Sequence, residues 1–182
     1  GVEMASYKKK YALDHRHLGI GGQADVFRAT NKDTGDDFAL KRCRSKDDDG
    51  LARFRREIEI QNSLDHRNIM PIIEHDEDDF LWYVMPLATK SLASELPPIH
   101  DALIEKVAED CLAGLRHAHG EGPVHRDVKP QNILLLEGDS GIRWVVADWG
   151  CARKKPGLTT QIRTRTGEFV ATEGFAPPEV YT

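Results

Sequence analysis

The stretch HRDVKPQN, residues 125–132, decides both the fold and the chemistry that this sequence predicts. It places a carboxylate, an ammonium group and an amide on one short segment. Asp127 can accept a proton from an attacking hydroxyl, Lys129 can neutralise charge on a moving phosphoryl group, and Asn132 can hold a magnesium ion. In-line phosphoryl transfer depends mainly on positioning and electrostatic stabilisation, so the segment indicates a phosphotransfer centre.

A glycine-rich segment, LGIGGQADV at residues 18–26, lies between two predicted strands at 11–18 and 24–30. Glycines let the backbone approach a phosphate chain without side-chain collisions. Because the glycines join two strands and do not open a helix, the pattern argues against a dinucleotide-binding fold. A third predicted strand, 38–41, ends at Lys41, whose ammonium can bind the α- and β-phosphates of a nucleotide.

An amphipathic helix is predicted at residues 50–64 from apolar residues at helical spacing. Glu57 lies beside its apolar positions, where a carboxylate needs a partner. Lys41 is the obvious partner, and a surface pairing with Arg53 or Arg56 is the alternative.

The sequence then predicts a hairpin, with strands at 72–74 and 80–85 around an acidic turn, and a change of character after Met85. A long helix is expected at 101–119. Its apolar stripe consists of Ile104, Val107, Ala108, Cys111 and Leu115.

Two further strands are predicted at 133–136 and 142–147. The second ends at Asp148, where a carboxylate is well placed to hold Mg²⁺ together with Asn132. From residue 151 to 177 polarity rises and periodicity disappears, which is typical of functional or disordered segments. A sheet followed by helices, with a hinge near Pro86, indicates a two-lobed α+β protein.

Composition excludes several classes of protein. The net charge of −5 gives no basic field for nucleic acid, and no apolar run approaches the ~20 residues that span a bilayer. Three widely spaced cysteines favour a reduced, cytoplasmic compartment. Cys111 is expected in the core, and Cys151 is expected to be a small buried thiol rather than a reactive one.

In their order and spacing these motifs resemble the eukaryotic-type protein kinase domain, closest in style to the bacterial Ser/Thr kinases. The resemblance runs from about Tyr11 to the end of the chain. It implies an α+β, two-lobed fold with an antiparallel-sheet N-lobe at residues 1–86 and an incomplete, mostly helical C-lobe at 87–182. It also implies ATP and Mg²⁺ as cofactors and protein serine or threonine hydroxyls as acceptors, since Lys129 is typical of Ser/Thr kinases.

By this resemblance Asp127 is the catalytic base, assisted by Lys129. Lys41 and Glu57 form the ion pair of the family, and Asn132 and Asp148 are the metal ligands. The Pro86 carbonyl and the Ala88 N–H would bind adenine beside the gatekeeper Met85, and Val26, Ala39 and Leu134 would sandwich the ring. The full set implied in ATP binding is Leu18, Gly19, Ile20, Gly21, Gly22, Gln23, Ala24, Asp25, Val26, Ala39, Lys41, Met85, Pro86, Ala88 and Leu134.

Regulation is implied by Arg126, beside the catalytic aspartate. A phosphate on the activation loop would pair with it through charge-assisted hydrogen bonds, and self-phosphorylation is the expected source. The candidate acceptors are Thr159, Thr160, Thr164 and Thr166. Thr172 instead resembles the threonine that contacts the catalytic aspartate and lysine.

Four departures from the family pattern stand out. Trp149 replaces a phenylalanine and Gln61 replaces an apolar residue, so we expect these two side chains to make a polar contact. Pro177 replaces an alanine, which we expect to be mild. The chain stops three residues after Glu179, whereas kinases of this family continue. We therefore expect a ragged apolar surface, weak or no activity of the isolated chain, and a partner or further segment that completes the C-lobe.

Two other interpretations stay open. An aminoglycoside-type phosphotransferase shares the spacing from Asp127 to Asn132, although Lys129, the threonine-bearing loop and Pro178-Glu179 argue against it. A non-catalytic pseudokinase scaffold usually lacks the lysine, the base or a metal ligand, and this sequence retains all of them.

Overall fold

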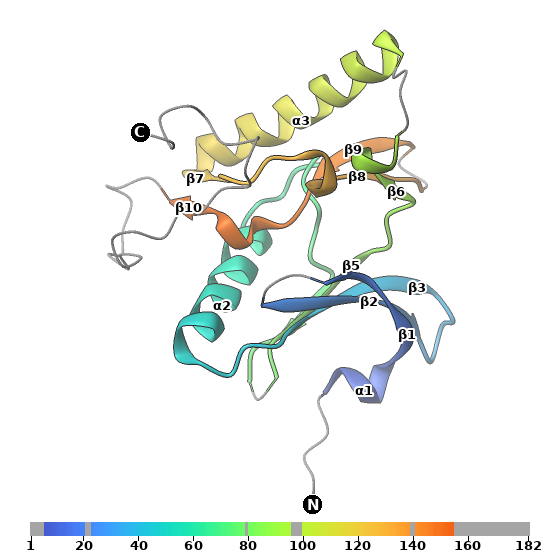
Figure 1. Ribbon diagram of the computed structural model, residues 1–182, viewed down its shortest axis with the longest axis vertical. Helices are drawn as coiled ribbons and strands as arrows, with labels where there is room; N and C mark the ends of the chain where they lie inside the picture. The colour runs from blue at the N-terminus through green and yellow to red at the C-terminus, as the bar shows by residue number, and fades with distance from the viewer. Residues whose placement is uncertain (1–5, 21–22, 79, 96–99, 139–140, 155–182) are drawn as a thin grey trace, which may run out of the picture. The chain divides into compact units, whose positions relative to one another are not determined.

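The computed structural model describes residues 6–20, 23–78, 80–95, 100–138 and 141–154 (Figure 1). The chain divides into two compact units. The N-terminal unit comprises Gly1–Asn62 and Met70–Ala88, and the C-terminal unit comprises Ser63–Ile69 and Thr89–Thr182.

The N-terminal unit is built on a five-stranded antiparallel sheet in the order β1-β2-β3-β5-β4. Its elements are α1 (Tyr7–Lys10), β1 (Tyr11–Ile20), β2 (Ala24–Asn31), β3 (Asp37–Cys43), α2 (Asp48–Asn62), β4 (Glu74–Asp76) and β5 (Trp82–Pro86). The first three predicted strands are confirmed, each slightly longer than expected. The β2–β3 turn is held by the Asn31 side chain, which accepts the Asp33 N–H at 2.9 Å, and by Gly35 at φ 80°.

The hairpin formed by β4 and β5 is confirmed, but its first strand begins later than predicted. The ladder runs from the pair Glu74–Val84 to the pair Asp76–Trp82. Pro71 has no N–H to contribute, so the hydrogen bonds on this side begin with Ile73 N–H to the Val84 carbonyl at 2.8 Å.

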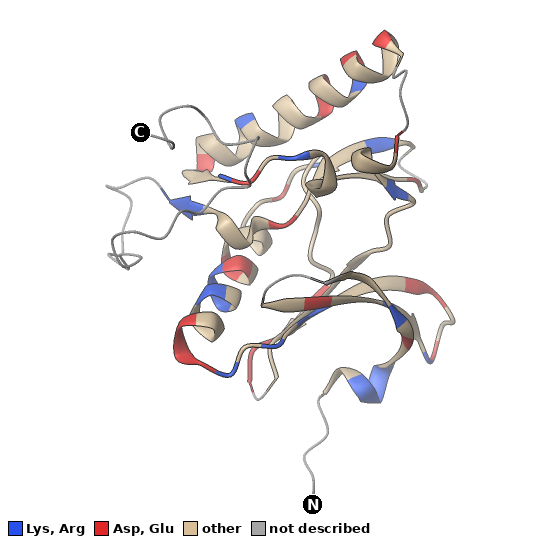
Figure 2. Cartoon of the chain, viewed as in Figure 1, with Lys and Arg blue, Asp and Glu red and all other residues tan. Residues whose placement is uncertain are grey.

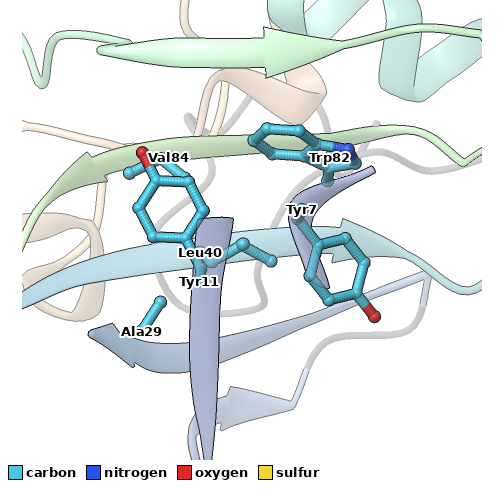
Figure 3. Packing of buried hydrophobic residues seen from close by; sticks show 6 residues of the cluster. All are labelled: Tyr7, Tyr11, Ala29, Leu40, Trp82 and Val84. Atoms are coloured by element: carbon cyan, nitrogen blue, oxygen red, sulfur yellow. The ribbon is translucent and has the colours of Figure 1, made fainter. Parts of the chain in front are cut away.

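Strand alternation gives the sheet two faces of different character. One face carries a packed apolar cluster drawn from α1, β1, β2, β3 and β5: Tyr7, Tyr11, Ala29, Leu40, Trp82 and Val84 (Figure 3). The aromatic rings of Tyr7 and Tyr11 meet Trp82 edge-on, at centroid distances of 6.0 and 6.3 Å. Through this cluster, Tyr7 and Tyr11, near the start of the described chain, pack against the sheet.

Helix α2 begins at Asp48, two residues before the predicted start. The Asp47 carboxylate accepts the Gly50 N–H at 2.8 Å and so caps the helix. Hydrogen bonds from Ser45 and Gly50 lower the pKa of Asp47. Asp48 and Asp49 add negative charge at the helix N-terminus, visible in red in Figure 2, where the helix dipole favours it.

The C-terminal unit combines one long helix with short strands. Its elements are β6 (Lys90–Ser91), η1 (Leu92–Ser94), α3 (Asp101–Glu121), β7 (Pro123–Val124), η2 (Pro130–Asn132), β8 (Ile133–Leu136), β9 (Arg143–Val146), η3 (Trp149–Cys151) and β10 (Arg153–Lys154). Strands β6, β8 and β9 form one sheet, and β7 pairs with β10. With the N-terminal sheet, this confirms the predicted α+β class.

The predicted apolar stripe of α3 is partly wrong. Cys111 is buried as expected, but Ile104 and Ala108 are exposed. The buried positions of α3 are Val107, Asp110, Cys111, Gly114 and Ala118. The buried face is rotated because Asp110 accepts the Trp144 N–H at 2.9 Å, so a polar residue fixes the helix against β9. Among the described helices, none is long and apolar enough to cross a membrane.

A close approach at Gly114 predicts a large difference between two glycines of α3. A Cβ at Gly114 would lie 2.6 Å from the carbonyl oxygen of Asn68, a buried residue that bonds to β9 through its side chain and its backbone. We expect Gly114→Ala to lower the free energy of unfolding by about 1–3 kcal/mol. Gly120→Ala is the matched control, because nothing lies within 4 Å of its Cβ position. In urea unfolding, the free energy of unfolding of the control should rise by about 0.5–1 kcal/mol. Equal effects of the two changes would contradict the close approach of Gly114 to Asn68.

Candidate functional site

The segment 125–132 brings three predicted site residues together in the C-terminal unit. Asn132 Nδ2 donates to the Asp127 carbonyl at 2.9 Å and to Asp127 Oδ2 at 3.1 Å. Lys129 Nζ lies 2.9 Å from the same carboxylate oxygen. The 3-10 turn η2, begun by Pro130, places Asn132 back beside Asp127. A carboxylate, an ammonium group and an amide therefore converge on one point.

His125 anchors this segment to the end of β9. Its Nδ1 accepts the Asp127 N–H at 3.2 Å, so Nε2 carries the proton and donates to the Ala147 carbonyl at 3.0 Å. The imidazole is buried and meets Trp149 edge-on, with the ring centroids 4.6 Å apart. This anchoring role was not predicted. Only the position of His125 at the start of segment 125–132 hinted at it.

Two residues with left-handed backbone flank this anchor. Arg126 has φ 69° and Asp148 has φ 62°, and both are non-glycine residues. Such conformations are costly and persist only where the surrounding structure enforces them, often at functional sites. Arg126 directly follows His125, and Asp148 directly follows Ala147. The hydrogen bond from His125 to the Ala147 carbonyl is therefore well placed to hold both left-handed residues.

Asn132 and Asp148, the predicted metal ligands, lie at the same end of the β8–β9 pair. Ile133 pairs with Val146, and the Ala147 N–H donates to the Asn132 carbonyl at 2.8 Å. Because Nδ2 of Asn132 is bonded to Asp127, the amide oxygen is the atom that a cation would meet. Among the described residues no group of three or more His, Cys, Asp or Glu could hold a metal ion. A cation here would need additional oxygen ligands from a bound substrate.

In the N-terminal unit, Lys41 and Glu57 form a buried ion pair between β3 and α2. Of the two partners considered for Glu57, the structure therefore selects Lys41 as an ion-pair partner. The Tyr83 hydroxyl donates to the same Glu57 oxygen at 2.7 Å. Tyr83 was missed from the sequence, although alternation along β5 places it on the face of Lys41.

The strand register places Val26, Ala39 and Met85, three of the predicted adenine-binding residues, on one face of the sheet. Val26 pairs with Lys41 across β2 and β3, and Ala39 pairs with Met85 across β3 and β5. Pro86 ends β5 and Ala88 follows it. Leu134 belongs to β8 of the other unit.

The glycine-rich segment is described on both sides of its turn. Gly19 pairs with Val26 and Ile20 with Asp25, while Gly21 and Gly22 lie outside the described residues. Leu18 and Gln23 are exposed and Ala24 is buried.

The side chain of Asp25, a residue of the implied nucleotide-binding set, forms ion pairs within the sheet. The residue is only 3% exposed, and strand alternation directs it away from the face of Val26. Its carboxylate lies 3.3 Å from Arg44, 3.6 Å from Arg42 and 3.7 Å from His17. The Asp25 side chain thus joins three strands, and a role of this residue in nucleotide binding stays a prediction.

The contact expected between Gln61 and Trp149 would join the two units and stays a prediction. The Gln61 amide donates to the Met70 carbonyl at 2.9 Å, and the Trp149 indole donates to the Val146 carbonyl at 3.3 Å. Each of these donors has a partner within its own unit. The indole and the amide are both buried, which explains why each has a backbone partner.

Cys111 is buried as the sequence predicts, whereas Cys151 is only half-buried. Burial raises the pKa of Cys111 to about 11. Burial also raises the pKa of Cys151, assisted by the carboxylates of Asp127 and Asp148. Since the thiolate is the reactive form, both thiols are poor nucleophiles. The predicted phosphate acceptors Thr159, Thr160, Thr164, Thr166 and Thr172 lie outside the described residues.

Two histidines, the buried His125 and the half-buried His66, predict loss of stability in acid. Burial lowers the pKa of His125, and burial followed by the neighbouring His117 lowers that of His66. As the pH falls, these histidines therefore bind protons in the unfolded chain before they do in the folded protein. Their contribution to the free energy of unfolding is complete above about pH 6.5 and is lost at lower pH. We expect the free energy of unfolding to decrease below that pH by up to about 1.4 kcal/mol per pH unit for each group. In urea unfolding from pH 7.5 to 5, His125→Gln should flatten this dependence, whereas exchange of the exposed His119 for Gln should leave it unchanged. An equal slope in all three proteins would contradict the assignment.

Comparison with known proteins agrees with this geometry. The protein kinase domain family matches residues 13–182. The chain is 32% identical to calcium-dependent protein kinase 5 of Plasmodium berghei, over 81% of this chain and 27% of that kinase. It is 30% identical to the serine/threonine-protein kinase PrkC of Bacillus subtilis, over 90% of this chain and 26% of the relative. It is 35% identical to the serine/threonine-protein kinase PknJ of Mycobacterium tuberculosis, over 91% of this chain and 29% of the relative.

The chain thus spans less than a third of the length of these relatives. The family match covers nearly the whole sequence, including the segment 125–132 and the pair Lys41–Glu57. The chain belongs to the protein kinase domain family.

Proposed function

We propose that this chain is the catalytic region of a serine/threonine protein kinase, which transfers the γ-phosphate of ATP to hydroxyl groups of proteins. The observation that carries the proposal is the convergence of Lys129 and Asn132 on the Asp127 carboxylate, at 2.9 and 3.1 Å. Relatives whose names describe serine/threonine kinases support the choice of acceptor.

Asp127 has the role of base in this proposal. Both contacts reach its Oδ2 atom and hold that oxygen against the segment. The acceptor hydroxyl gives its proton to this carboxylate as its oxygen attacks the phosphorus atom. The Lys129 ammonium, held beside the carboxylate, offsets negative charge on the γ-phosphoryl group.

Asn132 and Asp148 are the residues that would hold Mg²⁺, each through a side-chain oxygen. Their position at the same end of two paired strands fits a cation that also takes phosphate oxygens and water. The bound cation would neutralise negative charge on the phosphates.

Lys41, held by Glu57, is proposed to bind the α- and β-phosphates. Val26, Ala39 and Met85 lie on the same face of the sheet as Lys41, which supports an apolar surface for adenine there. The Pro86 carbonyl and the Ala88 N–H remain the proposed hydrogen-bond partners of the adenine ring.

Regulation by a phosphothreonine is proposed at Arg126. Burial lowers the pKa of its guanidinium, and so does the nearby positive charge of Arg153. Two cations close together favour an anion between them. The phosphate would come from self-phosphorylation of an activation-loop threonine. We also propose that the protein is located in the cytoplasm.

The acceptor class tests this proposal. The protein is incubated with [γ-³²P]ATP and Mg²⁺ together with casein in one reaction and kanamycin in another, and labelled amino acids are identified after hydrolysis. We expect label on serine or threonine of casein or of the chain itself. Label on kanamycin alone would indicate a small-molecule phosphotransferase, and Mg²⁺·ATP binding without any transfer would indicate a scaffold.

A further inference from the structure

We infer that Tyr83 is a positioning residue for the ion pair of Lys41 and Glu57, acting through its hydroxyl group. The inference rests on the proposed function, in which that pair aligns the phosphates of ATP. Tyr83 lies in β5, directly across from Lys41 in the strand register. It therefore belongs to the sheet, whereas Glu57 belongs to helix α2.

Three contacts place Tyr83 at the centre of this arrangement. Its hydroxyl donates to Glu57 Oε1 at 2.7 Å, and that oxygen also binds the Lys41 ammonium. The Lys41 ammonium lies 5.8 Å from the centroid of the Tyr83 ring. The ring also packs on Phe54, one helical turn before Glu57, with centroids 5.6 Å apart. One side chain thus contacts both charges and the helix that carries the carboxylate.

Burial explains why the hydroxyl matters. Lys41 is 8% exposed, Glu57 is 5% exposed and Tyr83 is 1% exposed. In such a setting the attraction between two charges offsets the loss of their hydration only when further hydrogen bonds satisfy the groups. The Tyr83 hydroxyl supplies one of these bonds to the carboxylate.

The hydroxyl also ties α2 to the sheet independently of Lys41. When Lys41 binds phosphate, its ammonium divides its hydrogen bonds between Glu57 and the nucleotide. The bond from Tyr83 to Glu57 does not involve the nucleotide, so it keeps the carboxylate in place while Lys41 is shared. Without it, Glu57 and α2 are freer to leave Lys41, and the phosphates are less well aligned.

A purely structural role for Tyr83 is the competing explanation, since any buried hydroxyl needs a partner. The chain offers a matched control for it in Tyr11. That ring is also buried, at 3% exposed, and its hydroxyl donates to a carboxylate, Glu74 Oε2, at 2.8 Å. Tyr11 lies in the apolar cluster on the other face of the same sheet (Figure 3). Tyr83→Phe and Tyr11→Phe therefore remove the same group from a buried ring bonded to a carboxylate, although Glu74 is 34% exposed, and only the first removes it from Glu57.

The test compares steady-state kinetics for ATP in the wild-type protein and these two variants, alongside hydrogen exchange of the α2 amides. For Tyr83→Phe we expect kcat/KM for ATP to fall by about tenfold, the order expected for one hydrogen bond to a charged group, and α2 to exchange faster. Tyr11→Phe should leave kcat/KM and the exchange of α2 unchanged, even if it lowers thermal stability.

Two results would overturn the inference: an unchanged kcat/KM in Tyr83→Phe while the wild type transfers phosphate, or an equal loss in Tyr11→Phe. If the wild type transfers no phosphate, the proposed function fails instead. Hydrogen exchange then decides the inference alone, because unchanged exchange of α2 in Tyr83→Phe would refute a positioning role.

Discussion

Asp127→Asn should lower the rate of phosphate transfer by about 1,000-fold, within the range typical of a lost general base. The substitution keeps the size and shape of the side chain. It removes the negative charge that accepts the proton of the attacking hydroxyl and that attracts the Lys129 ammonium 2.9 Å away. Asn132 can still donate to the Asp127 carbonyl, so the segment should keep its conformation.

The measurement is the initial rate of ³²P transfer at saturating ATP, together with ATP affinity and thermal stability. Affinity and stability should change little, since the lost group acts on the acceptor hydroxyl. The exposed Asp65 offers a control through the same Asp→Asn exchange in the same unit, and it should transfer phosphate at the wild-type rate. A rate for Asp127→Asn within a few-fold of the wild type would remove Asp127 from the chemistry.

Lys41→Met should have the second largest effect, on both stability and activity. It leaves the Glu57 carboxylate, 5% exposed, without its cationic partner. Breaking a buried pair in this way typically costs about 3–5 kcal/mol. The Tyr83 hydroxyl still donates to Glu57, which places the expected loss near the lower end of that range. Transfer should fall by about 100-fold or more, because the ammonium that positions the phosphates is gone.

The double variant Lys41→Met with Glu57→Gln separates these two effects. Neutralising residue 57 removes the buried unpaired charge, so urea unfolding should recover much of the lost stability. Phosphate transfer should stay as low as in the single variant. Recovery of both properties would show that Lys41 serves stability alone, and recovery of neither would contradict the buried pair.

The strands and helices that position the site could be predicted because local patterns encode them. Alternation and turn residues locate β2 and β3, and a helical apolar pattern locates α2. The pairing of Lys41 with Glu57 was predictable for a similar reason, since a carboxylate on a buried helix face needs a cation. The grouping of Asp127, Lys129 and Asn132 needed only their closeness in sequence.

What could not be predicted depends on contacts between distant segments. Tyr83 reaches Glu57 only because β5 and α2 meet, and the sequence does not fix that distance. The ion pairs of Asp25 were not predicted, although alternation from Val26 already directs its side chain to the opposite face. The buried face of α3 follows from Asp110 and Gly114, whose partners Trp144 and Asn68 lie far away in the chain.

The most direct test of the central claim is where the γ-phosphate goes and whether it needs Asp127. One assay with [γ-³²P]ATP, Mg²⁺ and a protein acceptor, run for the wild type and for Asp127→Asn, answers both questions. The account predicts label on serine or threonine with the wild type and almost none with the variant. Equal labelling by the two proteins, or label that never reaches a serine or threonine, would contradict it.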